Sequence, residues 1–348
     1  MTDILHLEGC NFQQIACSHR ERPSPSARGR IGERGRALAD QRGTLAARHA
    51  SGRPTFARRT LSQARKTGVF RGRFCYVDRV RIASLHVYPL KGARGIALER
   101  AEVLASGIRH DRRFMALGQD GAFITQRAHP SMALVDVALA GDRLSLSVGA
   151  ASASVPLAPD GPRRRVRVWD DEVEAIDVGG EGAELLSQHL GQRCSLVFMP
   201  LDVIRPVESP YGRLGDRVGF ADAYPVLVAT LASLADLNAR LTASGEPPVP
   251  IDRFRANVVV EGGEPFEEEG ATSMRLGGLS VRTPKRSSRC QVTTVDQRTA
   301  ATSKEPLRTL ARYRTEANKV LFAMNAIPDL AADASIVVAV GDAVAYLR

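Results

Sequence analysis

The first regularly patterned stretch of the chain is RIASLHVYP, residues 81–89, where apolar residues alternate with others. Alternation with a period of two gives a strand one apolar face that packs on a core. The pattern recurs in FMALG, AFITQR, ALVDVALAG and DRLSLSVG, each bounded by Gly, Asp or Pro. Many short strands at close spacing are typical of a sheet or barrel. We therefore predict a strand-rich module that begins near residue 80.

Further strands and a few helices follow this module. RRRVRVWDDEVEAIDVG predicts two strands around Asp170-Asp171, and SMRLGGLSVRTP predicts a hairpin around Gly277-Gly278. Helical spacing predicts helices in GAELLSQHLG, ended by Gly191, and in ATLASLADLNARL, capped by Thr230. EPLRTLARYR predicts a third helix, FRANVVVEG a short buried strand, and SIVVAVGDAVAYLR two final strands. The predicted fold class is α+β and rich in strands, with domains at residues 80–200 and 201–348.

The basic charge is confined to the first part of the chain. The formal net charge of the 348 residues is +10, and residues 1–79 hold 16 basic and six acidic residues. The Arg-rich composition of residues 1–79 predicts a disordered tail. This composition is typical of an arm that binds nucleic acid or of a targeting segment. The alternative is that the translation start was assigned too far upstream, so that residues 1–79 are absent from the real protein. Because the remaining residues are neutral overall, we expect no nucleic-acid partner.

The cysteines argue against several cofactors. Of five, only Cys194 and Cys290 lie beyond residue 79, and the chain has no CxxC pair or Cys/His cluster. This excludes a zinc site, an iron–sulfur cluster and a disulfide framework, and it favours a reducing cytoplasm. No apolar run reaches the roughly 18 residues of a membrane-spanning helix.

Cys290 lies in KRSSRCQVTTVDQ, residues 285–297, beside Lys285, Arg286 and Arg289. Basic neighbours favour the thiolate, which is the form that binds metals and attacks electrophiles. Arg, Lys, Ser and Thr together also suit a bound anion. A buried structural cysteine beside a solvated basic loop remains the alternative.

Three other motifs carry candidate ligand-binding residues. Lys91 follows a strand in a Gly-containing turn, where it can meet a phosphate. HDRRFM, residues 110–115, predicts a strand with one arginine inside and one outside, the inner one pairing with Asp111 or a ligand. In FRANVVV, Arg255 and Asn257 are expected on one face of a strand. Surface or structural roles are the alternatives for each.

In order along the chain, these motifs resemble the MOSC family, named for the molybdenum cofactor sulfurase C-terminal domain. The resemblance covers residues 81–348 and rests on VYPLKGARG, GIRHDRRFMAL, FITQRAHPSMALV, GFADAYPVLVAT, SLADLNARL, RFRANVVVEGGEPFEEE, SRCQVTTVD and SKEPLRTLARYR. It implies an N-terminal β-barrel module followed by a MOSC β-barrel domain with peripheral helices. Within the family the chain is similar to the mitochondrial amidoxime reducing component and to bacterial reductases of N-hydroxylated bases.

The resemblance implies a role for each candidate residue. It makes Cys290 the protein ligand of molybdenum in a molybdopterin cofactor. It places around that cofactor Lys91, Arg112, Tyr224, Thr230, Arg255, Asn257 and Ser288. Asp296 is a candidate proton-relay carboxylate on the same strand pattern as Cys290. Gly92 stands where the family often has Ser, which removes one hydroxyl from the expected phosphate site.

The implied activity is reduction of small N-hydroxylated substrates such as hydroxylamines and amidoximes. Electrons would come from a separate ferredoxin or cytochrome b5-type protein with its reductase, because no cysteine follows Cys290. Two alternatives stay open. In the first, the chain is a carrier of the molybdenum cofactor or of sulfur. In the second, it is a nucleic-acid-binding protein that acts through residues 1–79.

Overall fold

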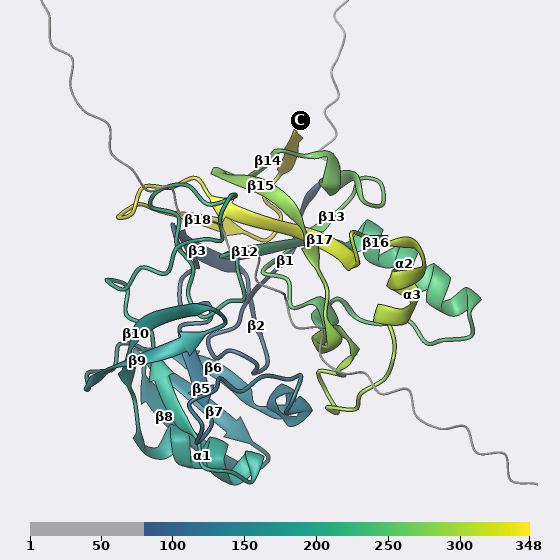
Figure 1. Cartoon of the computed structure of the whole chain (residues 1–348). Helices are drawn as coiled ribbons and strands as arrows, with labels where there is room; N and C mark the ends of the chain where they lie inside the picture. Colours follow the sequence, from purple (N-terminus) through teal and green to yellow (C-terminus); the bar gives the residue numbers. More distant parts are fainter. Residues whose placement is uncertain (1–79) are drawn as a thin grey trace, which may run out of the picture. The chain divides into compact units, whose positions relative to one another are not determined.

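The computed structural model describes residues 80–348, and the predicted tail at residues 1–79 lies outside them. The described part is rich in strands and contains three α-helices, which confirms the predicted fold class (Figure 1). None of its helices has the length and apolar character required to cross a bilayer.

The largest sheet has nine strands, and it connects the beginning of the described chain with its end. Along it lie β19 (Val344–Leu347), β14 (Ser273–Leu276), β15 (Leu279–Ser288), β17 (Lys319–Pro328), β12 (Val226–Thr230), β13 (Val258–Glu261), β1 (Arg81–Val87) and β2 (Ile96–Leu98), with β16 (Thr315–Glu316) paired to β17. Val87, Val228, Val260 and Met324 belong to its shared core. The hairpin β14–β15 turns at Gly277-Gly278, as predicted.

The N-terminal segment, residues 80–200, contains two smaller sheets. One has the order β5 (Phe114–Leu117), β11 (Ser195–Phe198), β10 (Asp171–Asp177) and β9 (Arg163–Val168), and the other contains β6 (Asp136–Ala140), β7 (Arg143–Val148) and β8 (Ala151–Pro156). Helix α1 (Gly180–Leu190) packs on β7 and β8 (Figure 1). It ends at Gly191, whose left-handed φ of 64° suits a residue without Cβ.

A third small sheet crosses the predicted domain boundary. It contains β18 (Ser335–Ala339), β3 (Arg100–Leu104) and β4 (Gly107–Ile108). Strand β1 pairs with β13, and β3 pairs with both β4 and β18. Strands from before and after residue 200 therefore share sheets, so the sheets do not follow the predicted division at residue 200. The two final strands have different partners, since β18 pairs with β3 and β19 with β14.

The other two helices lie side by side at one end of the large sheet (Figure 1). Helix α2 (Leu231–Ala243) starts at Thr230, whose Oγ1 accepts a hydrogen bond of 3.1 Å from the backbone N–H of Ser233, so the predicted cap is confirmed. Helix α3 is Leu307–Tyr313, with Pro306 just before it. Four 3-10 turns complete the described elements: Pro130–Leu134, Ile251–Phe254, Glu267–Gly270 and Gln291–Thr294.

Candidate functional site

A cavity of about 860 Å³ gathers residues from both segments of the described chain. It is lined by all the predicted site residues except Thr230 and Asp296, namely Lys91, Arg112, Tyr224, Arg255, Asn257, Ser288 and Cys290. Thr230 caps α2 instead. Residues that are far apart in the sequence therefore meet at one site.

Arg112 and Arg255 lie on the ring of one tyrosine, Tyr88. Their guanidinium carbons are 4.2 Å and 4.4 Å from its ring centroid, and its hydroxyl donates to the carbonyl oxygen of Ala256 at 3.2 Å. Arg112 also donates to Asn257 Oδ1 at 3.1 Å and to the carbonyl oxygen of Arg255 at 3.1 Å. These contacts fix both arginines on a shared aromatic support.

Both arginines occupy turns, which corrects two predictions. Arg112 and Arg255 have left-handed φ values of 46° and 54°, and each lies before its strand, β5 or β13. Arg255 and Asn257 are therefore not strand residues. In HDRRFM neither arginine is exposed, because Arg113 is buried and the Arg112 side chain is only 13% exposed. Asp111 pairs with Arg112 at 2.6 Å, so the anionic partner is the protein carboxylate, which was one of the two predicted alternatives.

Lys91 is buried at the base of its turn. Its Nζ donates to the carbonyl oxygen of Phe220 at 2.8 Å and to Asp222 Oδ1 at 2.6 Å. Burial lowers the pKa of Lys91, although Asp222 raises it. The neighbouring Gly92 has a φ of 89°, a conformation that favours glycine at this position.

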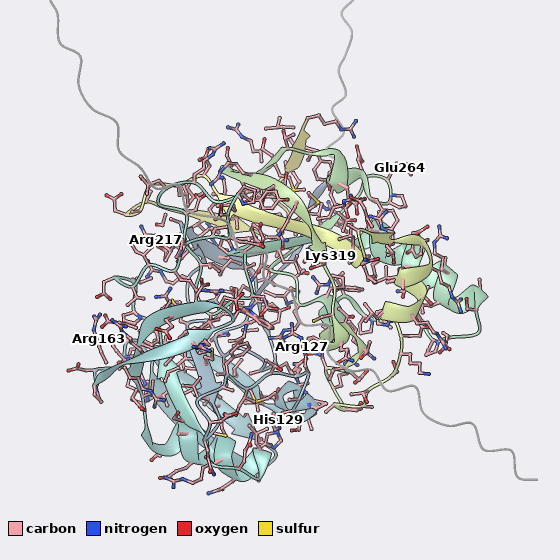
Figure 2. All side chains as sticks on the ribbon, in the orientation of Figure 1. Arg127, His129, Arg163, Arg217, Glu264 and Lys319 are labelled. Atoms are coloured by element: carbon pink, nitrogen blue, oxygen red, sulfur yellow. The ribbon has the colours of Figure 1, made fainter. Side chains whose placement is uncertain are left out.

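Cys290 follows β15 and precedes the 3-10 turn Gln291–Thr294. Arg127 Nη2 lies 3.4 Å from its Sγ, while the Arg127 guanidinium lies 4.7 Å from the ring centroid of Trp169 and 3.6 Å from Asp222. Figure 2 labels Arg127 where the N-terminal segment approaches this loop. No local sequence pattern predicted a role for Arg127, Trp169 or Asp222. Arg127 lies in the FITQRAHPSMALV motif, and its place in that motif is the sequence signal that could have identified it as a site residue.

Arg289 is the second arginine beside Cys290, and it is partly buried. Its Nη2 donates to the carbonyl oxygen of Phe254 at 2.9 Å and its Nη1 to Ser287 Oγ at 2.9 Å, whereas its buried Nε has no partner. Burial lowers its pKa and also lowers the pKa of Arg255 to about 10. No carboxylate of residues 80–348 forms an ion pair with either arginine. A buried cation without such a partner is costly unless an anion joins it.

The cavity as a whole fits an anionic ligand with a soft metal. Eight basic and four acidic side chains line it. Within residues 80–348, no three His, Cys, Asp or Glu residues gather as a metal site. Cys290 is therefore a single soft donor, which suits a metal whose other ligands arrive with an anionic cofactor.

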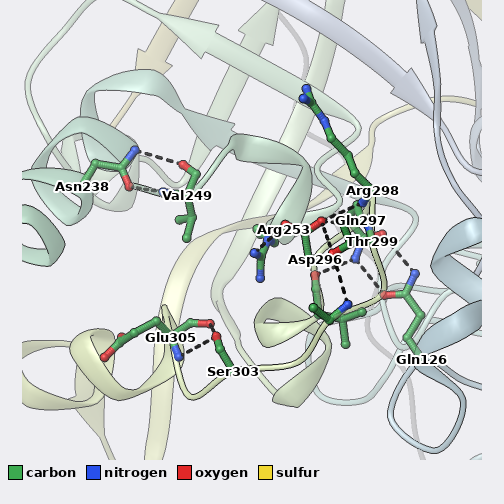
Figure 3. A network of polar contacts seen from close by, with 12 residues as sticks. Gln126, Asn238, Val249, Arg253, Asp296, Gln297, Arg298, Thr299, Ser303 and Glu305 are labelled. Atoms are coloured by element: carbon green, nitrogen blue, oxygen red, sulfur yellow. Dashed lines mark hydrogen bonds and ion pairs between the residues drawn. The ribbon is translucent and has the colours of Figure 1, made fainter. Parts of the chain in front are cut away.

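Asp296 occupies a turn outside the cavity, so its predicted place on a strand with Cys290 is wrong. Its Oδ1 accepts from the backbone N–H of Arg298 at 3.0 Å and of Thr299 at 2.9 Å, and its Oδ2 pairs with Arg253 at 2.9 Å (Figure 3). Burial raises its pKa, but these hydrogen bonds and Arg253 outweigh burial and hold the pKa below its ordinary value. The carboxylate therefore stabilises the loop after Cys290.

The described chain thus combines a strand-rich fold with a cavity that is rich in basic side chains and contains one cysteine. Residues 79–193 match the MOSC N-terminal beta barrel domain, and residues 215–345 match the MOSC domain. The chain belongs to the MOSC family, as the sequence motifs predict.

Two kinds of relative are found. Mitochondrial amidoxime-reducing component 1 of Mus musculus is 33% identical over 247 residues, which cover 67% of this chain and 71% of the relative. The Homo sapiens protein of that name is 33% identical over 246 residues, or 67% of this chain and 72% of the relative. A molybdenum cofactor sulfurase of Oryza sativa subsp. japonica is 28% identical over 276 residues, but they cover only 32% of it and 71% of this chain.

Proposed function

We propose that the protein is an oxidoreductase that binds the molybdenum cofactor and reduces N-hydroxylated compounds. The observation that carries the proposal is the position of Cys290 in a cavity with two arginines, the buried Arg255 and the partly buried Arg289, that lack a carboxylate partner in residues 80–348. The amidoxime-reducing relatives support the class of reaction.

In this proposal the chain holds the cofactor at two places. Cys290 ligates molybdenum as a thiolate. Arg255, Arg289 and Lys91 bind the phosphate as cations, and Ser288 adds a hydroxyl. Arg112, Asn257 and Tyr224 line the same cavity and orient these groups. When bound, the cofactor supplies two-electron chemistry at an N–O bond.

The protein's own contribution is to bind and orient the substrate. The overall reaction takes R–NH–OH, two electrons and two protons to R–NH₂ and water. Arg127 beside Cys290 and the half-exposed Trp169 offer a cation and an aromatic face to a small substrate at the cavity. Electrons come from a separate protein donor, a ferredoxin or a cytochrome b5-type protein with its reductase. The cytoplasm suits this chemistry because Cys290 must stay reduced.

The test is turnover by full-length protein made in a host that produces the cofactor. With a chemical reductant in place of the protein donor, the protein should convert benzamidoxime and hydroxylaminopurine to the amidine and the amine. Cys290→Ser should abolish turnover, whereas Cys194→Ser should retain it because Cys194 lies outside the cavity. Cofactor-loaded protein that reduces no N-hydroxylated compound would contradict the proposal.

The sulfurase relative supports a second candidate function, delivery of the cofactor or of sulfur to other enzymes. This carrier would use the same cavity. It predicts that loaded protein transfers its cofactor to a cofactor-free molybdoenzyme and shows no reductase activity. The same preparation therefore separates the two functions.

A further inference from the structure

Two buried glutamines connect the N-terminal segment to the loop after Cys290. Gln126 and Gln297 are 1% and 5% exposed, and their side-chain amides face each other (Figure 3). Gln126 Nε2 donates to Gln297 Oε1 at 3.0 Å, and Gln297 Nε2 donates to Gln126 Oε1 at 3.0 Å. A reciprocal amide pair in a buried site has a narrowly defined geometry, because each side chain supplies both a donor and an acceptor.

The remaining hydrogen bonds of the pair extend to the loops around it. Gln126 Nε2 also donates to the carbonyl oxygen of Gly92 at 2.7 Å, and Gln297 Nε2 donates to that of Val295 at 3.0 Å. Arg94 Nη2 donates to the backbone carbonyl oxygen of Gln297 at 3.0 Å. The pair therefore connects the Lys91–Gly92 turn to the loop that follows Cys290.

The pair also contacts the cationic cavity directly. Gln297 Oε1 accepts a hydrogen bond of 3.2 Å from Arg255 Nη1, and Gln126 directly precedes Arg127, whose Nη2 lies near Cys290 Sγ. Gln297 is a neutral acceptor for Arg255. A carboxylate in its place would hold the guanidinium equally well but would cancel its charge.

We propose that Gln297, held by Gln126, is a positioning residue that aims Arg255 into the cavity and leaves its positive charge available to an anionic ligand. This inference rests on the proposed function, in which that ligand is the phosphate of the cofactor. Asp296, the carboxylate next to Gln297, points away toward Arg253 and plays no part in this arrangement.

Gln297→Glu separates positioning from simple cross-linking of the two segments. The variant keeps the size of the side chain and an acceptor for Arg255, but its carboxylate cannot donate to Gln126 Oε1 or to the carbonyl oxygen of Val295, so the thermal midpoint should fall. The new carboxylate neutralises Arg255, so affinity for an anion should fall about tenfold. Gln297→Met loses the same donors without adding a negative charge, so a role in cross-linking alone predicts that it weakens anion binding as much as Gln297→Glu.

The matched control is Asn238→Ala. Asn238 also makes two amide hydrogen bonds to the backbone of another residue, since its Nδ2 donates to the carbonyl oxygen of Val249 at 3.0 Å and its Oδ1 accepts from the N–H of Val249 at 2.9 Å (Figure 3). It does not line the cavity. This variant should lower the thermal midpoint and leave anion affinity unchanged.

The experiment is calorimetric titration of cofactor-free, full-length protein with inorganic phosphate, with thermal unfolding of each variant. Molybdenum content is measured for the same variants made in a cofactor-producing host. We expect weaker phosphate binding and less molybdenum for Gln297→Glu than for Gln297→Met, although both variants lose the amide donor bonds. Phosphate affinity and molybdenum content equal to wild type in Gln297→Glu would overturn the inference. Wild-type protein that binds neither phosphate nor molybdenum would overturn the proposed function, and the inference with it.

Discussion

The two turns that carry Arg112 and Arg255 have the same local design and different electrostatics. Each arginine has a left-handed φ, precedes a strand and stacks on Tyr88. Arg112 is paired with the buried carboxylate of Asp111 at 2.6 Å. Arg255 has only the neutral amide oxygen of Gln297 at 3.2 Å. Arg112 is therefore neutralised within the protein, whereas Arg255 keeps a charge for a ligand.

This difference indicates how a buried site stays ready for an anion. Burial raises the pKa of Asp111, while Arg112 and hydrogen bonds from the N–H of Tyr88 and from Asn257 lower it. These bonds satisfy the Asp111 carboxylate within the protein, so the Asp111–Arg112 pair needs no ligand. The charge on Arg255 is stabilised mainly by its contact with Tyr88 and by hydrogen bonding, so an incoming phosphate gains a strong, charge-assisted partner. In the proposed function, the Arg112 pair therefore has a structural role and Arg255 binds the anion.

The largest expected effect is on stability, from Arg112→Met. This change leaves Asp111 buried without its cation, so the free energy of unfolding should fall by about 3–5 kcal/mol. Urea unfolding measures it. Arg167→Met is the control, because Arg167 pairs only with Glu172 at the surface and its loss should cost less than about 1 kcal/mol. An Arg112→Met protein as stable as the control would contradict the assigned role of the pair.

The second prediction concerns Tyr88 at alkaline pH. Burial raises the pKa of Tyr88 to about 12, although Arg255 and Arg112 lower it. The unfolded chain loses this proton near pH 10, so between pH 10 and 12 the unfolded state binds fewer protons and stability falls as pH rises. The loss reaches about 3 kcal/mol, and it is absent below pH 10.

Tyr88→Phe should remove this pH dependence while keeping the ring under both arginines. Urea unfolding of the two proteins at pH 9, 10 and 11 provides the comparison. At pH 9 the variant should be slightly less stable than the wild type, because the hydrogen bond to Ala256 is lost. As pH rises, the wild type loses stability and the variant does not, so the difference in the free energy of unfolding should shift in favour of the variant. A constant difference across this range would show that Tyr88 does not titrate as described.

The third prediction is that Arg255→Met separates binding from stability. Removal of a buried cation whose partner is neutral should change the free energy of unfolding by less than about 1 kcal/mol. Phosphate binding to the cofactor-free protein should weaken by about 2 kcal/mol, the contribution of a hydrogen bond to a charged group. Calorimetric titration measures the second effect. Unchanged phosphate affinity would assign Arg255 the same structural role as Arg112.

The smallest effect is expected from Asp296→Asn. The amide keeps the acceptor for Arg298 and Thr299 and loses only the partly exposed ion pair with Arg253, so stability should fall by about 1 kcal/mol or less. Because the folded-state pKa is lowered, this difference exists above about pH 4 and disappears as the wild-type carboxylate is protonated at lower pH. Reductase activity should not change. A loss of activity at unchanged stability would restore the proton-relay hypothesis.

The strands, helices and hairpin were predictable because their signals are local. The local patterns identified β1, β5, β6, β7, β9 and β10, Gly191 ended α1, and Thr230 capped α2, whereas β8 was missed and AFITQR forms no strand. The turns at Arg112 and Arg255 were not predictable, because alternation counts residues and does not detect a left-handed φ just before a strand. Most cavity residues were found through the family motifs.

The missing part of the site depends on long-range contacts. Lys91 pairs with Asp222, Arg127 contacts Cys290, and Gln126 pairs with Gln297, each across more than one hundred positions of sequence. No local pattern reports such pairs. Asp296 was predicted as a proton-relay carboxylate, yet it is the neighbouring neutral side chain of Gln297 that contacts Arg255 in the cavity.

The most direct test of the account is the molybdenum content of full-length protein made in a cofactor-producing host. Elemental mass spectrometry should find close to one molybdenum per chain in the wild type and in Cys194→Ser, and markedly less in Cys290→Ser. Equal metal in all three proteins would contradict the role of Cys290 as ligand. A folded wild type without molybdenum, from a host whose other molybdoenzymes are active, would contradict cofactor binding itself.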